Sequence, residues 1–170
     1  GLLRVTTSLA FSTHQLTPIL PEFLARYPHV RLELLPTDRV VDMIEEGIAV
    51  ALRIGRLADT SFMARKIGED RRLICAAPAY LAQHGAPRRP EDLARHDCIL
   101  SRERTALNRW QFRVDGEIRT IDVTGRLAVD EGELQLQLAM QGLGIVRLTR
   151  LTVAQAVRAG TLVPLLGEFS

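Results

Sequence analysis

This chain of 170 residues has few lysines, few aromatic residues and no long apolar runs. Lys66 is the only lysine, and the 22 basic and 20 acidic residues give a net charge of +2 that is interspersed along the chain. A domain that holds DNA by itself usually shows a basic stripe, so the sequence disfavours DNA binding by this segment alone. No apolar run approaches the roughly 20 residues that span a bilayer, which argues against a membrane protein.

Cysteine is also scarce, and both cysteines, Cys75 and Cys98, lie in apolar runs. We therefore expect buried free thiols of a cytoplasmic protein and not a disulfide or a redox pair. The first residues do not resemble a signal peptide, and because no initiator Met is present we expect a piece of a longer protein. Hydrophobic residues at 46% and charged residues at 25% are typical of a globular domain.

Motifs of catalysis and metal binding are missing as well. The sequence contains no Gly-x-Ser-x-Gly elbow, Walker loop or His-Glu-x-x-His. His96-Asp97-Cys98 with Cys75 lacks paired metal-ligand spacing, so a surface histidine beside buried thiols is expected in place of a zinc site. Gly142-Leu143-Gly144 follows a predicted helix, and we interpret it as a helix stop and not as a dinucleotide fingerprint. The sequence thus predicts no enzyme, no metal and no cofactor.

The first half of the chain alternates predicted strands with predicted helices. Apolar spacing predicts strands at 2–7, 30–35 and 49–54 and helices from about Thr7 to Tyr27 and from Thr37 to Gly47. This order predicts a parallel sheet with right-handed crossovers. Arg53 lies inside the last strand, where it needs an anion or the open end of the sheet.

The second half predicts another α/β unit, so the chain is expected to form two lobes with a cleft between them. Asp115-Gly116 predicts a hairpin turn, and Trp110 and Phe112 in that hairpin are expected in the core. Strands are predicted at 71–77, 97–100, 110–114, 118–123, 127–129, 145–148 and 161–166, and helical segments at 79–84, 91–94, about 131–141 and 149–159.

Two strand-to-helix junctions, Thr7-Ser8 and Asp130-Glu131, are candidate ligand positions. Free N–H groups at a helix start favour a carboxylate or phosphate, and ligands of open α/β sheets bind beyond the carboxyl ends of strands. The plainer alternative is that Ser8 or Ser12 only caps a helix.

Several segments, in this order along the chain, resemble the effector-binding domain of LysR-type transcriptional regulators. They are LTPILPEFLARYPHVRLEL, VDMIEEGIAVALRIGRLADTSFMARKIG, LICAAPAYLAQHGAPRRPEDLARHDCIL, GELQLQLAMQGLGIVRLTR and AGTLVPLL. The resemblance implies two Rossmann-like lobes with a cleft, as in type 2 periplasmic binding proteins. It implies lobe I at 1–70, lobe II at 71–163 and a return towards lobe I at 164–170, with further lobe I elements and a winged helix-turn-helix outside this sequence.

The resemblance also implies a function. A small-molecule inducer, expected to be a carboxylate, would bind in the cleft of a bacterial, cytoplasmic regulator that acts as a homodimer or homotetramer. DNA would be bound only through the N-terminal domain, and no membrane would be involved. A solute-binding protein of a transporter with the same fold is the first alternative, and an enzyme on a doubly wound fold is the second.

Carried over by position, the inducer site draws on both lobes. We expect the Ser8 and Thr37 hydroxyls and nearby N–H groups to bind a carboxylate, and Ser101 or Arg102 to close on it. Arg147 departs from the usual family pattern and adds a charge on the cleft side of lobe II, as a ligand contact or as a surface residue. The expected ligand-binding residues are Thr7, Ser8, Thr37, Ile54, Gly55, Ser101, Arg102 and Asp130.

Overall fold

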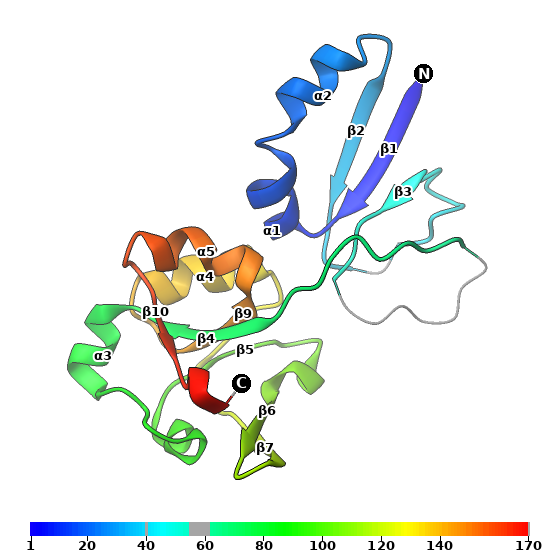
Figure 1. Cartoon of the computed structure of the whole chain (residues 1–170). Helices are drawn as coiled ribbons and strands as arrows, with labels where there is room; N and C mark the ends of the chain where they lie inside the picture. The colour runs from blue at the N-terminus through cyan, green and yellow to red at the C-terminus, as the bar shows by residue number, and fades with distance from the viewer. Residues whose placement is uncertain (40, 55–61, 170) are drawn as a thin grey trace. The chain divides into compact units, whose positions relative to one another are not determined.

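The computed structural model describes residues 1–39, 41–54 and 62–169, which divide into two compact units, Gly1–Asp70 and Arg71–Ser170 (Figure 1). The first unit contains the parallel sheet that the sequence predicts, and its three strands have the order β2-β1-β3. Its elements are β1 (Leu2–Thr7), α1 (Leu9–Phe11), α2 (Leu20–Arg26), β2 (Arg31–Pro36) and β3 (Val50–Ala51). Burial increases along β1, so that Thr6 and Thr7 at its carboxyl end are fully buried.

The single helix predicted after β1 is broken into pieces. After α1 the chain forms a π-helical turn at Ser12–Leu16, and α2 begins only at Leu20. Pro18 lacks an N–H group and its ring would crowd the preceding turn, which explains why one continuous helix does not form. Thr17 closes the π-helical turn, because both its N–H and its hydroxyl donate to the Ser12 carbonyl.

The helix predicted between Thr37 and Gly47 is not present in the described part of that range. Residues 43–47 form a turn, in which Asp42 Oδ1 accepts from the N–H groups of Ile44 and Glu45 at 2.8 and 3.0 Å. Gly47 ends this turn with a φ of +61°, which is the stop that the sequence predicts. Ile44 has the spacing of an apolar helix face, yet it is 78% exposed, so its side chain gives a helix no buried contact here.

The second unit is built on a mixed sheet. The antiparallel order β10-β4-β9 continues through bonds from Ile99 N–H to Ile145 O and from Ile145 N–H to Asp97 O into the parallel pair β5-β8. Its strands are β4 (Arg72–Ala76), β5 (Ile99–Leu100), β6 (Arg109–Val114), β7 (Glu117–Asp122), β8 (Leu127–Ala128), β9 (Val146–Thr149) and β10 (Val163–Leu165). Its helices are α3 (Pro78–His84), α4 (Gly132–Met140), α5 (Arg150–Arg158) and the 3₁₀ helices Pro90–Arg95, Thr105–Asn108 and Gly167–Phe169.

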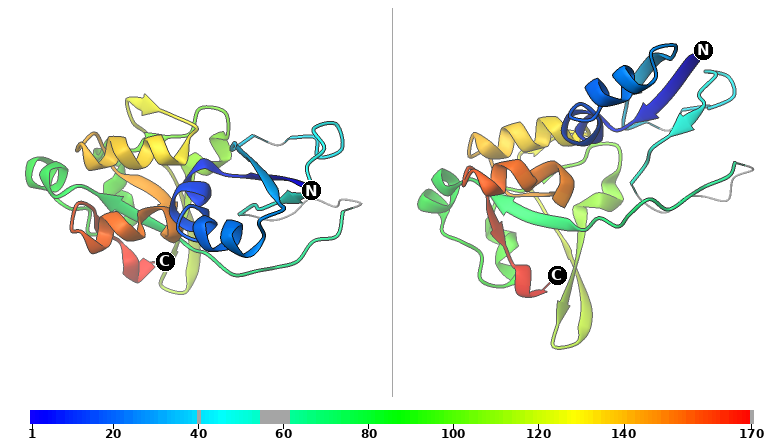
Figure 2. Two further views of the ribbon diagram at one scale, coloured as in Figure 1. Left: turned by 90° about the horizontal axis from the view of Figure 1, so that it is seen from above. Right: turned by 45° about the horizontal axis from the view of Figure 1, so that its top comes forward.

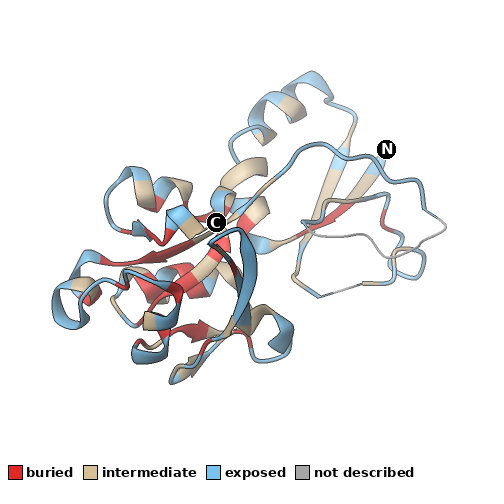
Figure 3. Cartoon of the chain, turned by 60° about the horizontal axis from the view of Figure 1, so that its bottom comes forward, coloured by how far each residue is buried: buried red, intermediate tan, exposed pale blue. Residues whose placement is uncertain are grey.

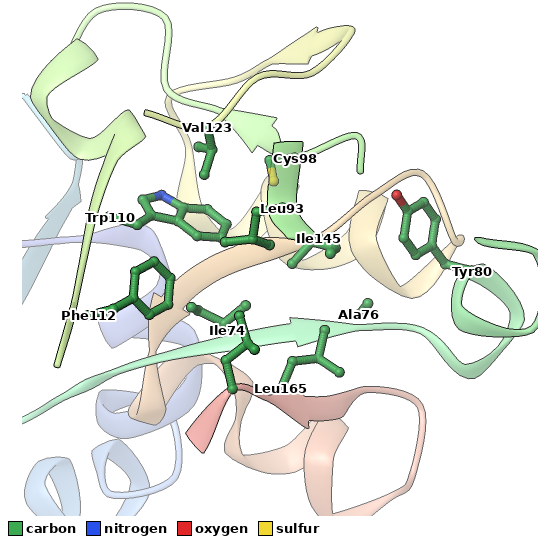
Figure 4. Packing of buried hydrophobic residues seen from close by; sticks show 11 residues of the cluster. Ile74, Ala76, Tyr80, Leu93, Cys98, Trp110, Phe112, Val123, Ile145 and Leu165 are labelled. Carbon is green, nitrogen blue, oxygen red and sulfur yellow. The ribbon is translucent and has the colours of Figure 1, made fainter. Parts of the chain in front are cut away.

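Two apolar clusters hold the second unit together, one on each face of its sheet. Helices α4 and α5 lie side by side over β4 and β9 (Figure 2), and Leu136 and Val153 bury their side chains there. On the opposite face Trp110 and Phe112 pack with Leu93 and Ile74 (Figure 4), which confirms that these aromatic residues are core. Strands β4 and β9, which lie between the two clusters, are largely buried, whereas β7 is mostly exposed (Figure 3).

The turn and the helix stop that the sequence predicts in the second unit are both present. Asp115 and Gly116 both have positive φ angles and join β6 to β7 as the predicted hairpin, and Gly142 stops α4 with a φ of +78°. Residues 164–169 differ from the expected return towards lobe I, because β10 pairs with β4 and both Leu165 and Leu166 are buried in the second unit.

His96 is buried, which corrects the expectation of a surface histidine. The Tyr80 hydroxyl accepts from Asp97 N–H at 3.0 Å and lies within hydrogen-bond distance of His96 Nδ1, at 3.2 Å. Burial lowers the pKa of His96, the nearby His84 lowers it further, and Asp92 opposes both effects. Neutral His96 is therefore the form that the folded protein favours.

We expect acidification below about pH 6.5, the ordinary histidine pKa, to destabilise the protein through His96. Histidine takes up a proton in the unfolded chain, while native His96 stays neutral until its own lower pKa is reached. The unfolding free energy therefore decreases as the pH is lowered, by at most about 1.4 kcal/mol per pH unit. Urea unfolding at several pH values, followed by Trp110 fluorescence, should show a smaller slope in His96→Gln; equal slopes would contradict this account.

Candidate functional site

The first group of candidate residues gathers at the carboxyl ends of β1 and β2. Thr37 N–H donates to the Thr7 carbonyl at 2.8 Å, which joins the two strand ends. Thr7 is completely buried, and its Oγ1 has no hydrogen-bond partner among the described residues. Thr7, Ser8 and Thr37 therefore come together, as predicted. Ile54 follows β3 with 47% of its surface exposed, and Gly55 lies outside the described residues.

Ser8 is the N-cap of α1. Its Oγ accepts from Phe11 N–H at 3.2 Å, which is the plainer role that the sequence left open for it. Thr37 makes a similar local bond, because its Oγ1 accepts from Arg39 N–H at 3.2 Å. Each hydroxyl uses its oxygen as an acceptor and keeps its own proton for donation.

Ser12 was considered only as a possible helix cap, yet the structure gives it a different character. Its side chain is buried, and its Oγ is the second buried oxygen without a hydrogen-bond partner in the described part of the chain, after Thr7 Oγ1. A buried hydroxyl without a partner costs roughly 1–3 kcal/mol. No sequence signal separates Ser12 from an ordinary helix serine, because its burial depends on how the chain folds back after β1.

Arg53 does not bind an anion within the described structure. Its guanidinium donates to the Thr37 carbonyl at 2.6 Å, to Thr6 Oγ1 at 2.8 Å and to the Arg39 carbonyl at 3.3 Å. Partial burial lowers the pKa of Arg53, and the charge of Asp38 opposes this change. Arg53 thus hydrogen-bonds to backbone and hydroxyl groups at the open end of the sheet. Of the two alternatives that the sequence predicts, an anion or the open end of the sheet, this is the second.

The second group of candidate residues lies in the second unit, around Asp130. Asp130 Oδ1 accepts from the Ser101 hydroxyl at 2.9 Å, from Arg102 N–H at 2.9 Å and from Glu103 N–H at 2.8 Å. Arg102 Nε also donates to Asp130 Oδ2 at 3.3 Å. The structure brings Ser101, Arg102 and Asp130 together, but they bind one another.

Asp130 directly precedes the N-cap residue of α4, which is the helix start near which the sequence places it. Glu131 is the N-cap of α4 and makes no side-chain cap bond, while the Asp130 carboxylate is directed towards residues 101–104. The Glu103 N–H bond is the main cause that lowers the pKa of Asp130; burial opposes it, and the bonds from Ser101 and Arg102 lower the pKa further. The carboxylate is therefore an internal anion that occupies the donors expected to close on a ligand.

Within the described residues, neither the two cysteines nor a cluster of metal-binding side chains adds another candidate site. Cys75 and Cys98 are buried free thiols, as predicted, and burial raises the pKa of each to about 12, so both are poor nucleophiles. Within residues 1–39, 41–54 and 62–169, no three His, Cys, Asp or Glu side chains gather closely enough to hold a metal ion. None of the helices in these ranges is long and apolar enough to cross a bilayer.

Comparison with known proteins places this arrangement in a family. The model of the LysR substrate binding domain matches residues 1–170. The HTH-type transcriptional regulator CrgA of Neisseria meningitidis is 34% identical over 168 residues, which cover 99% of this chain and 56% of CrgA. The HTH-type transcriptional regulator DmlR of Escherichia coli is 34% identical over 170 residues, which cover 99% of this chain and 55% of DmlR. The chain thus spans about half the length of these relatives.

The solved structure of the CrgA regulatory domain from Neisseria meningitidis has the same fold. It superposes with a TM-score of 0.92 at 34% identity and covers 100% of this chain and 83% of that one. The two-lobed α/β fold of the periplasmic-binding-protein type is thereby confirmed. These relatives are transcriptional regulators, so the alternative of a transporter's solute-binding protein finds no support. The chain belongs to the LysR family of transcriptional regulators and is its effector-binding, or substrate-binding, domain.

Proposed function

We propose that this chain senses a small-molecule inducer, a carboxylate, for a bacterial and cytoplasmic LysR-type regulator. The first unit would bind the carboxylate at the carboxyl ends of β1 and β2. The observation that carries this assignment is the pair of buried hydroxyls, Thr7 Oγ1 and Ser12 Oγ, that have no partner among the described residues. A carboxylate accepts hydrogen bonds only, and it would satisfy such donors.

Ser8 and Thr37 complete the proposed set of donors. Their oxygens already accept from Phe11 N–H and Arg39 N–H, so their own protons remain for a carboxylate oxygen. Hydrogen bonds to a charged acceptor are stronger than those between neutral groups. A carboxylate is therefore favoured over a neutral sugar at this position.

The remainder of the proposal concerns the whole regulator. We propose that the chain forms a homodimer or homotetramer and that ligand binding shifts its conformational equilibrium. DNA would be contacted only by a helix-turn-helix domain outside this sequence, as the names of the relatives suggest. The ligand would be bound and released unchanged, because the sequence predicts no pair of catalytic base and nucleophile.

A thermal-shift screen tests the proposal. Purified wild type is compared with Ser8→Trp in the presence of aromatic and aliphatic carboxylates, amino acids and sugars. A ligand at 100 times its dissociation constant stabilises by about 2.7 kcal/mol, which moves the unfolding midpoint by several degrees. We expect a carboxylate to produce this shift in wild type and the indole of Ser8→Trp to abolish it.

Thr13→Trp is the matched control, because Thr13 is exposed in the same stretch of chain and gains the same bulk. It should respond to the ligand as wild type does. A ligand shift that survives in Ser8→Trp would contradict the assigned position. No shift in wild type, while both proteins melt cooperatively, would contradict carboxylate sensing by this chain.

A further inference from the structure

Arg147 is a half-buried arginine in β9 of the second unit. Because side chains alternate along a strand, Arg147 shares a sheet face with Ile145, and the register places it opposite Ile74 of β4. Both isoleucines are buried in the apolar cluster of that face. The guanidinium of Arg147 therefore leaves the sheet beside apolar side chains.

A second cation lies next to it. Arg72 is two residues from Ile74 on the same strand face, diagonal to Arg147, and its Nη1 donates to the Arg147 carbonyl at 3.3 Å. Burial lowers the pKa of Arg147, and the positive charge of Arg72 lowers it further. Both effects oppose the charged form of Arg147, but a guanidinium keeps its proton in proteins.

No acidic side chain compensates this charge in the part of the chain that the structure describes. The Arg147 guanidinium makes no hydrogen bond or ion pair with a described residue, although Arg72 lies close to it. Other arginines in the described part of the chain do pair with carboxylates, among them Arg4, Arg31, Arg102, Arg109, Arg119 and Arg126. A half-buried charge without a counter-ion is unfavourable, and an anion from outside the chain would remove that penalty.

We propose that Arg147, with Arg72 beside it, binds the carboxylate of an organic acid on this face of the second unit. The inference rests on the proposed function in taking the ligand to be an organic acid. It assigns the second unit's anion contact to Arg147, because Asp130 already occupies the donors of Ser101 and Arg102. A planar guanidinium fork binds carboxylate oxygens in pairs, and apolar Ile74 favours an organic body over an inorganic ion.

Isothermal titration calorimetry with benzoate, succinate and inorganic phosphate, at one ionic strength set with NaCl, tests this site. We expect wild type to bind at least one of the two organic acids and Arg147→Gln to bind it at least about tenfold more weakly. Arg147→Lys should be intermediate, because lysine keeps the charge but loses the fork. Arg158→Gln, at an exposed position of α5, removes the same charge and should bind as wild type does.

A second readout separates a ligand contact from a merely structural arginine. Without added anion, Arg147→Gln should melt at or above the wild-type midpoint, because the variant no longer holds a cation beside Arg72. A structural role would lower that midpoint. The inference is overturned if Arg147→Gln binds the acids as well as wild type, if only phosphate binds, or if neither acid binds wild type up to about 10 mM.

The two proposals fail in different ways. Compounds that stabilise wild type and Arg147→Gln equally, but not Ser8→Trp, leave the sensing function intact and overturn the role of Arg147. The opposite outcome is that benzoate and succinate are the only compounds of the thermal-shift panel that stabilise wild type, and that Ser8→Trp binds both as tightly as wild type does. In that case the site in the first unit is contradicted, while the Arg147 site stands.

Discussion

Replacing Gly125 with alanine is expected to destabilise the second unit by about 3 kcal/mol. A Cβ atom at Gly125 would lie 1.8 Å from the Cys98 carbonyl oxygen and 2.8 Å from the Cys98 backbone nitrogen. That nitrogen donates to the Thr124 carbonyl at 2.9 Å, so the two segments cannot separate without breaking the bond. Because backbone and not a flexible side chain is in the way, no small rearrangement relieves the clash.

The measurement is thermal unfolding followed by the fluorescence of Trp110, the only tryptophan, which is buried in the second unit. A loss of about 3 kcal/mol corresponds to a fall of roughly 6–12 °C in the midpoint. Gly132→Ala is the matched control, since its Cβ would meet only Leu148 Cδ2 at an ordinary 3.8 Å. The control should be neutral or slightly stabilising. A Gly125→Ala protein that melts at the wild-type temperature would show that the close approach is wrong.

Asp130→Ala is expected to lower the unfolding midpoint by roughly 5 °C or more, because three donors lose one charged acceptor. The buried Ser101 hydroxyl and the N–H groups of Arg102 and Glu103 all point to Asp130 Oδ1. The lowered pKa adds a dependence on pH. The stabilisation by the ionised Asp130 carboxylate is complete above about pH 3.9, the ordinary pKa of aspartate, and is lost as the pH falls through the lower pKa that Asp130 has in the folded protein.

Asp122→Ala separates this effect from the loss of a surface charge. Among the described residues, the Asp122 carboxylate pairs only with the exposed Arg109 side chain, at 3.2 Å, and such surface ion pairs contribute little. We expect its midpoint to stay within about 2 °C of wild type. If the two aspartate variants have the same unfolding midpoint, Asp130 is an ordinary surface carboxylate, and the donors of Ser101 and Arg102 are available for a ligand.

Local patterns explain which parts of the fold could be predicted. Asp115-Gly116 requires positive φ angles that few other residues tolerate, so the hairpin is readable from two letters. The apolar strand at 2–7 and the glycine stop at Gly142 are similarly local. The prediction of a helix before Gly47 is wrong because Ile44 has helical spacing but its side chain is exposed. Asp42 instead stabilises a local turn by accepting from the N–H groups of Ile44 and Glu45.

The chemistry of the candidate sites depends on contacts between distant residues. The family resemblance places Ser101 and Asp130 in one site. It does not show that these two residues, which are 29 positions apart, hydrogen-bond to each other. His96 is buried because Tyr80, from α3, reaches its ring. Arg53 finds its acceptors up to 47 residues away. A one-dimensional pattern contains no information on these pairings, so it identifies candidate residues better than it identifies their roles.

The most direct test of ligand sensing is an amide NMR titration of the isotope-labelled chain with a carboxylate that stabilises it. We predict that the largest shifts fall on the amides of Thr7, Ser8, Ser12 and Thr37, saturate at one ligand per chain and disappear in Ser8→Trp. Shifts of equal size in Ser8→Trp, or shifts that leave these four amides unchanged, would contradict the proposed site at the ends of β1 and β2.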